Sequence, residues 1–160
     1  ALVFNTIQEL ILKEKILAGH DISAGGLITT LFEMCFSNTS GGITVNLTAF
    51  NDEDTVKILF SQNPGIVIQV KDEDEVAEIL LENGISYLSI GHPVMERNLL
   101  VTNMYETLTF EIDIYRDIWF RTSYLLDRKQ SGEKPALERF RNYKDHELKI
   151  TPGDFDGTFK

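Results

Sequence analysis

The residue types that could do chemistry gather in residues 20–26, where polar side chains run into a pair of glycines. The segment reads His-Asp-Ile-Ser-Ala-Gly-Gly, and an apolar stretch with helical spacing follows it. A helix that begins after two glycines exposes backbone N–H groups without partners, and its dipole adds roughly half a positive charge there. Anions bind at such ends, and glycine lets them approach the backbone closely. The segment therefore predicts a phosphate-binding loop.

Each side chain of this loop has both a ligand-binding and a purely structural interpretation. Ser23 could donate its hydroxyl to a phosphate oxygen, or it could only cap the helix. Asp21 offers the hard carboxylate oxygen that Mg²⁺ takes alongside phosphates and waters, or it could be a capping acid. His20 could hydrogen-bond a ligand or orient the loop. Gly25 and Gly26 could only permit a tight turn, since the segment matches neither the Walker A pattern nor the dinucleotide fingerprint.

The elements that must position the loop are helices and strands in mixed order. They are indicated by apolar residues at helical spacing, by short alternating runs and by Gly, Asn and Pro breaks. We expect helices over residues 2–17, 27–36, 72–82, 114–129 and 136–143, a short helix from the acids of 51–54 to residue 60, and strands over 43–47, 66–70, 85–94, 98–103 and 106–112. Hairpins together with helical crossovers predict an α+β fold, with helices packed on the faces of one mixed β-sheet.

Length and charge limit the classes of function. A chain of 160 residues with 42% hydrophobic content can bury one core. Its net charge of -10 argues against a nucleic-acid partner, because such binding depends on clustered Lys and Arg. The charge is uneven, with 5 basic and 16 acidic residues through Glu111 and 10 basic against 9 acidic residues after it. No apolar run approaches the roughly 20 residues of a membrane span, so no membrane partner is expected.

Three other features have structural interpretations that we favour over functional ones. Cys35 is the single cysteine and sits among apolar residues, which predicts a buried, inert thiol and a reducing, cytoplasmic location. His92 precedes Pro93, which favours a turn histidine over a ligand. The acidic run at 72–75 is typical of a solvated helix start, because carboxylates favour the positive end of the helix dipole.

The helix expected over residues 114–129 has aromatic and basic side chains that could serve binding. Trp119 and Tyr124 could stack a base, but a contact with the core or with another domain is favoured. Four basic residues form a sparse face that we expect to dock against another domain, namely Arg116, Arg121, Arg128 and Lys129.

Residues 18–27 closely resemble the H-D-x-S-x-G-G-L signature of the AIR-synthase-related C-terminal domain. Within that superfamily the chain is similar to the second such domain of the phosphoribosylformylglycinamidine synthases. Further matches follow in order: a strand start at 42–45, a "G-x-V-I-Q-V" strand at 64–70, an Ile-Gly pair at 90–91 and an "L-R-x-x-W-x-x-T-S" helix at 116–124. Position 24 is Ala here and is often Asp in relatives, so any contact of that side chain is missing.

The resemblance implies a fragment of an ATP-dependent carbon-nitrogen ligase of purine biosynthesis. Such glutamine amidotransferases convert formylglycinamide ribonucleotide, ATP and glutamine to the amidine, ADP, phosphate and glutamate. The family's magnesium ligand falls on Asp21 and its nucleotide contact on Ser23, while His20, Gly25 and Gly26 belong to the same motif. The resemblance thus implies Mg²⁺ and ATP or ADP as cofactors, and it implies no catalytic residue in this fragment.

The resemblance also predicts domain limits and partners. We expect residues 1–130 to form the AIR-synthase-related C-terminal domain, and 131–160 to form a short helix and a linker toward a glutaminase domain. The chain opens without an initiator methionine, and we expect it to be excised from a longer protein. An AIR-synthase N-terminal-type domain would form the other wall of the nucleotide cleft, so the fragment should be inactive alone. The alternative is a non-catalytic structural or assembly module that holds an auxiliary nucleotide.

Overall fold

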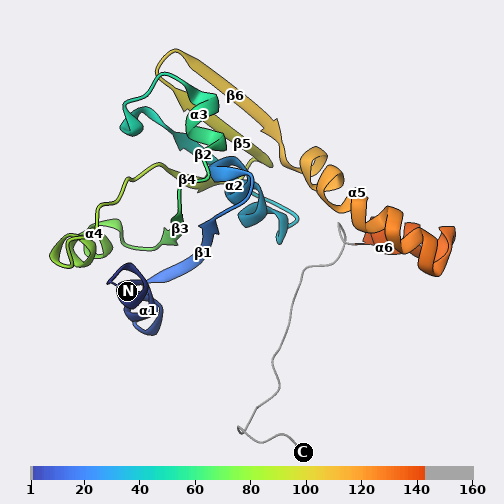
Figure 1. Ribbon diagram of the computed structural model, residues 1–160, viewed down its shortest axis with the longest axis horizontal. Coiled ribbons are helices and arrows are strands. Elements are labelled where there is room, and N and C mark those ends of the chain that lie inside the picture. The colour runs from blue at the N-terminus through green and yellow to red at the C-terminus, as the bar shows by residue number, and fades with distance from the viewer. Residues whose placement is uncertain (1, 143–160) are drawn as a thin grey trace, which may run out of the picture.

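The computed structural model describes residues 2–142, where six α-helices and six strands follow one another in mixed order (Figure 1). The expected α+β class is confirmed. The expectation of one sheet is wrong, because the strands form a two-stranded sheet and a four-stranded sheet. The linker predicted toward residue 160 lies outside the described residues. Within residues 2–142, no helix is long and apolar enough to cross a membrane.

The smaller sheet pairs β1 (Ile16–Ile22) with β3 (Gly65–Val70) in antiparallel order. Helices α1 (Leu2–Leu12) and α4 (Glu73–Glu82) pack on it around a small core of Leu10, Val76 and Leu80. Asp72 caps α4 by accepting a hydrogen bond from the backbone N–H of Glu75 at 3.1 Å. The acidic run at 72–75 is therefore a helix start, as predicted.

Helix α1 is shorter than the helix predicted over residues 2–17. It ends at Leu12, and Glu14 then adopts a positive φ of 56° in the turn that leads into β1. Residues 16–22 become a strand because the apolar strand β3 offers them hydrogen-bonding partners, with one register shift between Ile16 and Ala18. This pairing joins residues about 50 positions apart, so local helical spacing does not reveal it.

The larger sheet has the strand order β4-β2-β5-β6, with β2 (Gly42–Asn46) parallel to β5 (Asn98–Asn103). The other two pairings are antiparallel, β2 with β4 (Gly91–Val94) and β5 with β6 (Glu106–Glu111). This sheet is mixed, as expected.

The strand predicted over residues 85–94 forms only in its last four residues. Gly91 allows the close approach to β2, since a Cβ there would lie 2.0 Å from the carbonyl oxygen of Thr44. His92 lies within β4, opposite Thr44, and its side chain is exposed. The prediction of a turn histidine is therefore wrong: the proline that follows is tolerated because β4 is an edge strand.

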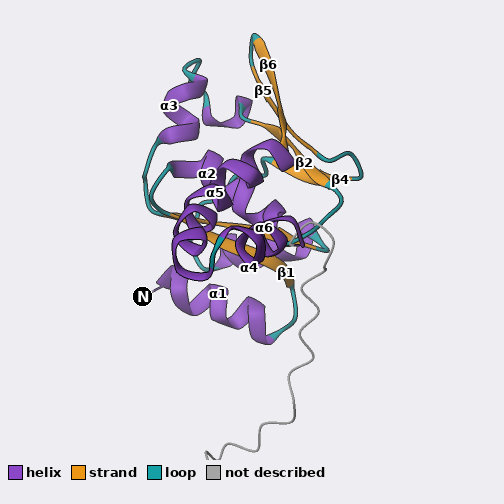
Figure 2. Ribbon diagram, turned by 90° about the vertical axis from the view of Figure 1, so that its right-hand side faces the viewer, coloured by secondary structure: helices purple, strands orange, loops and turns teal. Residues whose placement is uncertain are grey.

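Helix α2 (Gly26–Phe36) lies between the two sheets and is the centre of the larger core (Figures 1 and 2). Short helix α3 (Thr55–Phe60) packs beside it, preceded by a 3₁₀ turn at Thr48–Phe50. The backbone N–H of Lys57 donates to the Asp54 carboxylate, so the acids of 51–54 supply the cap of α3 but none of its first turn. The buried residues of this core are Leu27, Ile28, Leu31, Phe32, Cys35, Phe36, Val45, Leu47, Ile58, Leu59, Leu99, Val101 and Ile112.

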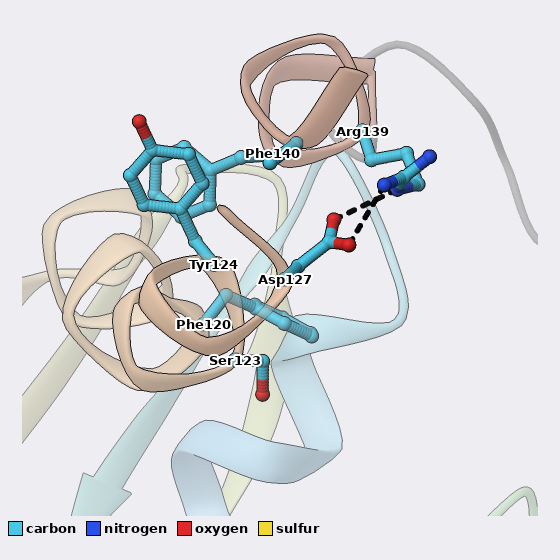
Figure 3. Close-up of a pocket in the computed structure, with 7 residues that line it drawn as sticks. Phe120, Ser123, Tyr124, Asp127, Arg139 and Phe140 are labelled. Atoms are coloured by element: carbon cyan, nitrogen blue, oxygen red, sulfur yellow. Dashed lines mark hydrogen bonds and ion pairs between the residues drawn. The ribbon is translucent and has the colours of Figure 1, made fainter. Parts of the chain in front are cut away.

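Two consecutive helices, α5 (Ile112–Ser131) and α6 (Glu133–Asn142), project from this body as a hairpin (Figure 1). Side chains of both helices line an open pocket of about 250 Å³ between them. At this pocket the rings of Tyr124 and Phe140 contact each other, with their centroids 4.8 Å apart (Figure 3). Asp127 accepts two hydrogen bonds from the guanidinium of Arg139 at 2.7 and 2.8 Å. Helix α6 is therefore held to the rest of the domain through α5.

The base of α5 is fixed to α2 by aromatic side chains. The ring of Tyr115 stacks on Phe32 at 4.7 Å, and Trp119 lies 6.1 Å from Phe36. Trp119 thus makes the predicted core contact with one side of its ring, while 50% of its surface is exposed. Arg116, expected on an exposed basic face, is instead 5% exposed, because it lies on the side of α5 that faces the body of the domain.

Cys35 lies on the buried side of α2, which confirms the predicted burial of this thiol. Burial raises the pKa of this thiol to about 11, and the charge of Arg97 acts weakly in the opposite direction. Because the pKa of Cys35 is higher in the folded than in the unfolded protein, the folded state is more stable with a protonated thiol than with a thiolate. This contribution to stability is complete below about pH 9 and is lost as the pH rises through about 11.

We therefore expect slow modification of Cys35 in the native protein. At pH 8 the thiolate fraction should be about 100-fold lower than in the unfolded chain, since the pKa differs by about two units. The measurement compares the rate of iodoacetamide alkylation with and without denaturant. Equal rates would show that the thiol is accessible and contradict its burial against the sheet.

Candidate functional site

The structure places the predicted loop on one continuous strand-turn-helix segment. His20 and Asp21 lie near the end of β1, opposite Val67 and Ile66 of β3, and Ile22 is the last paired residue. The chain then turns through residues 23–25 and enters α2 at Gly26. The five predicted site residues are thus brought together. His20 and Asp21 belong to a strand, and pairing with β3 fixes their backbone.

The start of α2 differs from the prediction at Ser23. The N-cap is Gly25, with φ of 90°, and no side chain caps the helix. Ser23 contributes its carbonyl oxygen, which accepts a hydrogen bond from the backbone N–H of Gly26 at 3.1 Å. Of the two interpretations of Ser23, the side-chain cap is wrong, because the tight turn places Ser23 two residues before the cap. Its exposed hydroxyl is therefore not used to start the helix.

The glycine pair has a packing role that is independent of any ligand. A Cβ on Gly25 would lie 2.3 Å from the Thr29 hydroxyl oxygen, and one on Gly26 would lie 2.7 Å from the carbonyl oxygen of Leu59. Both residues also have positive φ, which a side chain disfavours. The structural interpretation of the glycines is sufficient here: Gly26 lets the first turn of α2 touch the end of α3.

Asp21 combines an anchored backbone with an exposed carboxylate. Its carbonyl oxygen accepts a hydrogen bond from the Thr30 hydroxyl at 3.0 Å and lies 2.8 Å from His20 Nδ1. Its side chain is 72% exposed, and Oδ1 lies 3.6 Å from His20 Nδ1. The carboxylate therefore faces solvent from an anchored backbone.

His20 bridges strand β1 and helix α2. Its Nδ1 faces the carbonyl oxygen of Asp21, and its Nε2 lies 3.3 Å from Glu33 Oε2. Both side chains are largely covered, with 32% of His20 and 24% of Glu33 exposed. The ring is thus enclosed by protein oxygens on both edges.

The segment fits a nucleotide-bound Mg²⁺ as one part of its shell. Within residues 2–142, no group of three or more His, Cys, Asp or Glu side chains could hold a metal ion by itself. Mg²⁺ bound with phosphates commonly takes one or two carboxylates and completes its shell with phosphate and water oxygens. A single exposed Asp21 carboxylate is compatible with that donor set, provided that the nucleotide and other groups supply the rest.

Sequence reasoning did not identify Glu33 and Thr30. They lie on α2, close enough in sequence for both to face β1, and they contact His20 and Asp21 respectively. Thr30 and Glu33 are three residues apart, which places both on one face of a helix, and this spacing could have indicated that they contact the same neighbouring element. The contact itself needs the β1–α2 packing, which the predicted loop conformation of residues 20–22 did not include.

Comparison with known proteins identifies the family to which this strand-turn-helix arrangement belongs. The family described as AIR synthase related protein, C-terminal domain, matches residues 2–99, more than half of the chain. The chain therefore belongs to this family, and the identification suggested by residues 18–27 is confirmed.

Two similar proteins come from a virus and from human. The chain is 35% identical over 143 residues to "Probable membrane antigen 75" of Saimiriine herpesvirus 2. It is 30% identical over 149 residues to human phosphoribosylformylglycinamidine synthase. Each alignment covers 88% of the chain and 11% of the relative, so the chain spans about one ninth of these proteins.

Solved structures support the same fold. The chain is similar to Thermotoga maritima PurL complexed with ATP, with a TM-score of 0.63, 15% identity, and coverage of 72% of this chain and 21% of that one. The structure of PurLQS from Thermotoga maritima gives the same four values. The α+β arrangement described above is therefore the fold of this family.

Proposed function

We propose that this chain is one domain of a larger ATP-dependent ligase of the phosphoribosylformylglycinamidine synthase type. The parent would convert formylglycinamide ribonucleotide, ATP and glutamine to the amidine, ADP, phosphate and glutamate. The 30% identity with the human synthase supports this proposal, as does the shared fold with a PurL that was studied with ATP.

Within that enzyme, residues 20–26 form one wall of a magnesium-nucleotide cleft. Asp21 is the Mg²⁺ ligand, and Ser23 contacts a phosphate oxygen through its exposed hydroxyl. Gly25 and Gly26 shape the turn that brings these side chains to the start of α2. His20 orients the loop. When bound, Mg²⁺ supplies positive charge that offsets the charge on the phosphate oxygens.

One observation carries the proposal: the exposed Asp21 carboxylate stands on an anchored backbone at the end of a strand, next to a helix start. A carboxylate that only caps a helix would accept hydrogen bonds from that helix. Asp21 does not have this role, because Gly25 is the N-cap of α2 and no side chain caps it.

The parent enzyme supplies the other parts of the cleft. An AIR-synthase N-terminal-type domain forms the second wall, and a glutaminase domain supplies ammonia, with residues 131–160 leading toward it. The fragment alone does not hydrolyse ATP, because it has only one wall of the cleft. A reducing cytoplasm is the proposed location, consistent with the single, buried thiol of Cys35.

A second candidate function is a non-catalytic module that holds an auxiliary nucleotide. The name of the viral relative, which is 35% identical, states no enzymatic activity. Ala24 also occupies a position that is often acidic in related domains. The two functions differ in exchange: a catalytic site must release ADP in every cycle, while an auxiliary site keeps it. Exchange of bound ADP for labelled ADP separates them.

The test of the cleft is the substitution Asp21→Asn in the intact parent protein. We expect Mg²⁺-dependent ADP binding to weaken about tenfold or more, because the amide lacks the charge that Mg²⁺ favours. The measurement is ADP affinity by equilibrium dialysis in Mg²⁺ and in EDTA. Asp74→Asn, at an exposed acid on α4, is the matched control. Unchanged Mg²⁺-dependent binding in Asp21→Asn would refute the ligand assignment.

A further inference from the structure

The His20 ring occupies a covered position between β1 and α2, and its two nitrogens face two different elements. Nδ1 lies 2.8 Å from the Asp21 carbonyl oxygen on β1. Nε2 lies 3.3 Å from a Glu33 carboxylate oxygen on α2. A carbonyl oxygen and a carboxylate both accept hydrogen bonds, so whichever ring nitrogen carries a proton has an acceptor within reach.

This arrangement leaves no ring nitrogen of His20 for a nucleotide. A direct phosphate contact would require the ring to abandon either the Asp21 carbonyl or Glu33. His20 is therefore better placed to hold the protein together at this point than to bind ligand.

The same carbonyl oxygen is anchored a second time by α2. The Thr30 hydroxyl donates to the Asp21 carbonyl at 3.0 Å, from a position one turn before Glu33. Pairing with Ile66 of β3 fixes the other side of the Asp21 backbone. The exposed carboxylate is thus mounted on a backbone that α2 and β3 hold from both sides.

We propose that Glu33 is a positioning residue for the Asp21 carboxylate and that it acts through the His20 ring. The inference rests on the proposed function, in which Asp21 is a ligand of Mg²⁺. Glu33 sets the ring orientation, the ring sets the Asp21 peptide, and the peptide sets the direction of the carboxylate. Groups that orient a metal ligand in this way commonly change metal affinity by about 10–100-fold when they are removed.

The burial of Glu33 supports this role over that of an ordinary surface ion pair. An exposed pair loses most of its interaction energy to solvent and contributes little. Glu33 is only 24% exposed and His20 only 32% exposed, so the contact is partly shielded. By comparison, the Lys13–Glu9 pair on α1 has about half of each side chain exposed.

The test uses Glu33→Ala and Glu33→Gln in the intact parent protein, with Mg²⁺ and ADP as the probe. For Glu33→Ala we expect about tenfold weaker ADP binding in Mg²⁺ and unchanged ADP binding in EDTA. Glu33→Gln should restore most of the affinity, because the amide can accept a hydrogen bond from a protonated Nε2 or donate one to an unprotonated Nε2. Glu78→Ala, at an exposed Glu on α4, controls for loss of a carboxylate.

A double-mutant cycle with His20→Ala tests whether Glu33 acts through the ring. His20→Ala should weaken Mg²⁺-dependent binding as much as Glu33→Ala does, and the double variant should show no further loss. If Glu33→Ala does not fold, His20→Ala tests the role of the ring by itself, because it should weaken ADP binding in Mg²⁺ and leave ADP binding in EDTA unchanged. Equal loss in Mg²⁺ and in EDTA would indicate a merely structural role and overturn the proposal.

Two further outcomes separate this proposal from the one on which it rests. If Asp21→Asn weakens Mg²⁺-dependent ADP binding and Glu33→Ala does not, the positioning role is wrong and the cleft stands. If Asp21→Asn has no effect, the cleft is wrong and the positioning role is overturned with it. A Glu33→Gln variant as weak as Glu33→Ala would also overturn the positioning role.

Discussion

Replacement of Gly26 by alanine is expected to destabilise the domain by about 2 to 5 kcal/mol. Gly26 has φ of 74°, a conformation that costs an L-residue about 1 to 2 kcal/mol. The new Cβ would also lie 2.7 Å from the Leu59 carbonyl oxygen and 2.8 Å from that of Ser61. These are backbone atoms, so the end of α3 or the start of α2 must move as a unit.

The size of this effect is measured by the midpoint and free energy of urea unfolding. Gly84→Ala is the matched control, because Gly84 also has a positive φ of 66° but has no atom within 4 Å of the added Cβ. We expect Gly84→Ala to cost about 1 to 2 kcal/mol, from conformation alone. The difference between the variants isolates the close approach of α2 to α3, and equal losses would show that this contact adapts without cost.

Elements with local boundary signals were predictable from the sequence. Helix α4 begins at the cap Asp72 and ends at Asn83, followed by Gly84 with positive φ. Strand β3 is an apolar run between a proline turn and that cap. In these segments the hydrogen bonds that end each element come from residues next to it, so the sequence contains the whole signal.

Elements that depend on distant partners were not predictable in the same way. Residues 16–22 were assigned to a helix end and a loop, but β3 pairs with them across about 50 positions. Residues 85–90 were assigned to a strand, but within residues 85–94 only 91–94 form strand β4 beside β2. The division into two sheets has the same cause, because it depends on which strands meet around α2.

The candidate site was also predictable only where its features depend on neighbouring residues in the sequence. The motif at residues 20–26 located the site, because its residue types and order are local. The cap at Gly25 instead of Ser23, and the contact of Glu33 with His20, depend on how α2 packs against β1. The sequence therefore identifies the side chains that face a ligand more readily than those that orient them.

Arg97→Met is the second substitution for which we expect a large loss of stability, about 2 to 4 kcal/mol. Arg97 lies between β4 and β5, and only 18% of its side chain is exposed. Its Nη1 donates to the carbonyl oxygens of Cys35 at 3.1 Å and Gly41 at 3.0 Å, and its Nε donates to Asp113 at 3.1 Å. One guanidinium thus joins the end of α2, the entry to β2 and the first turn of α5.

Methionine retains the apolar stem of Arg97 but removes the donor to the Gly41 carbonyl oxygen and the Asp113 carboxylate, while the Cys35 carbonyl oxygen keeps the backbone N–H of Asn38. The two carbonyl contacts are partly buried, so water replaces them poorly. Thermal and urea unfolding measure the loss. Lys57→Met, which removes the exposed ion pair with Asp52, is the matched control and should change stability by no more than about 1 kcal/mol. A loss for Arg97→Met no larger than for this control would mean that apolar and aromatic contacts hold α5 to α2 without a contribution from this guanidinium.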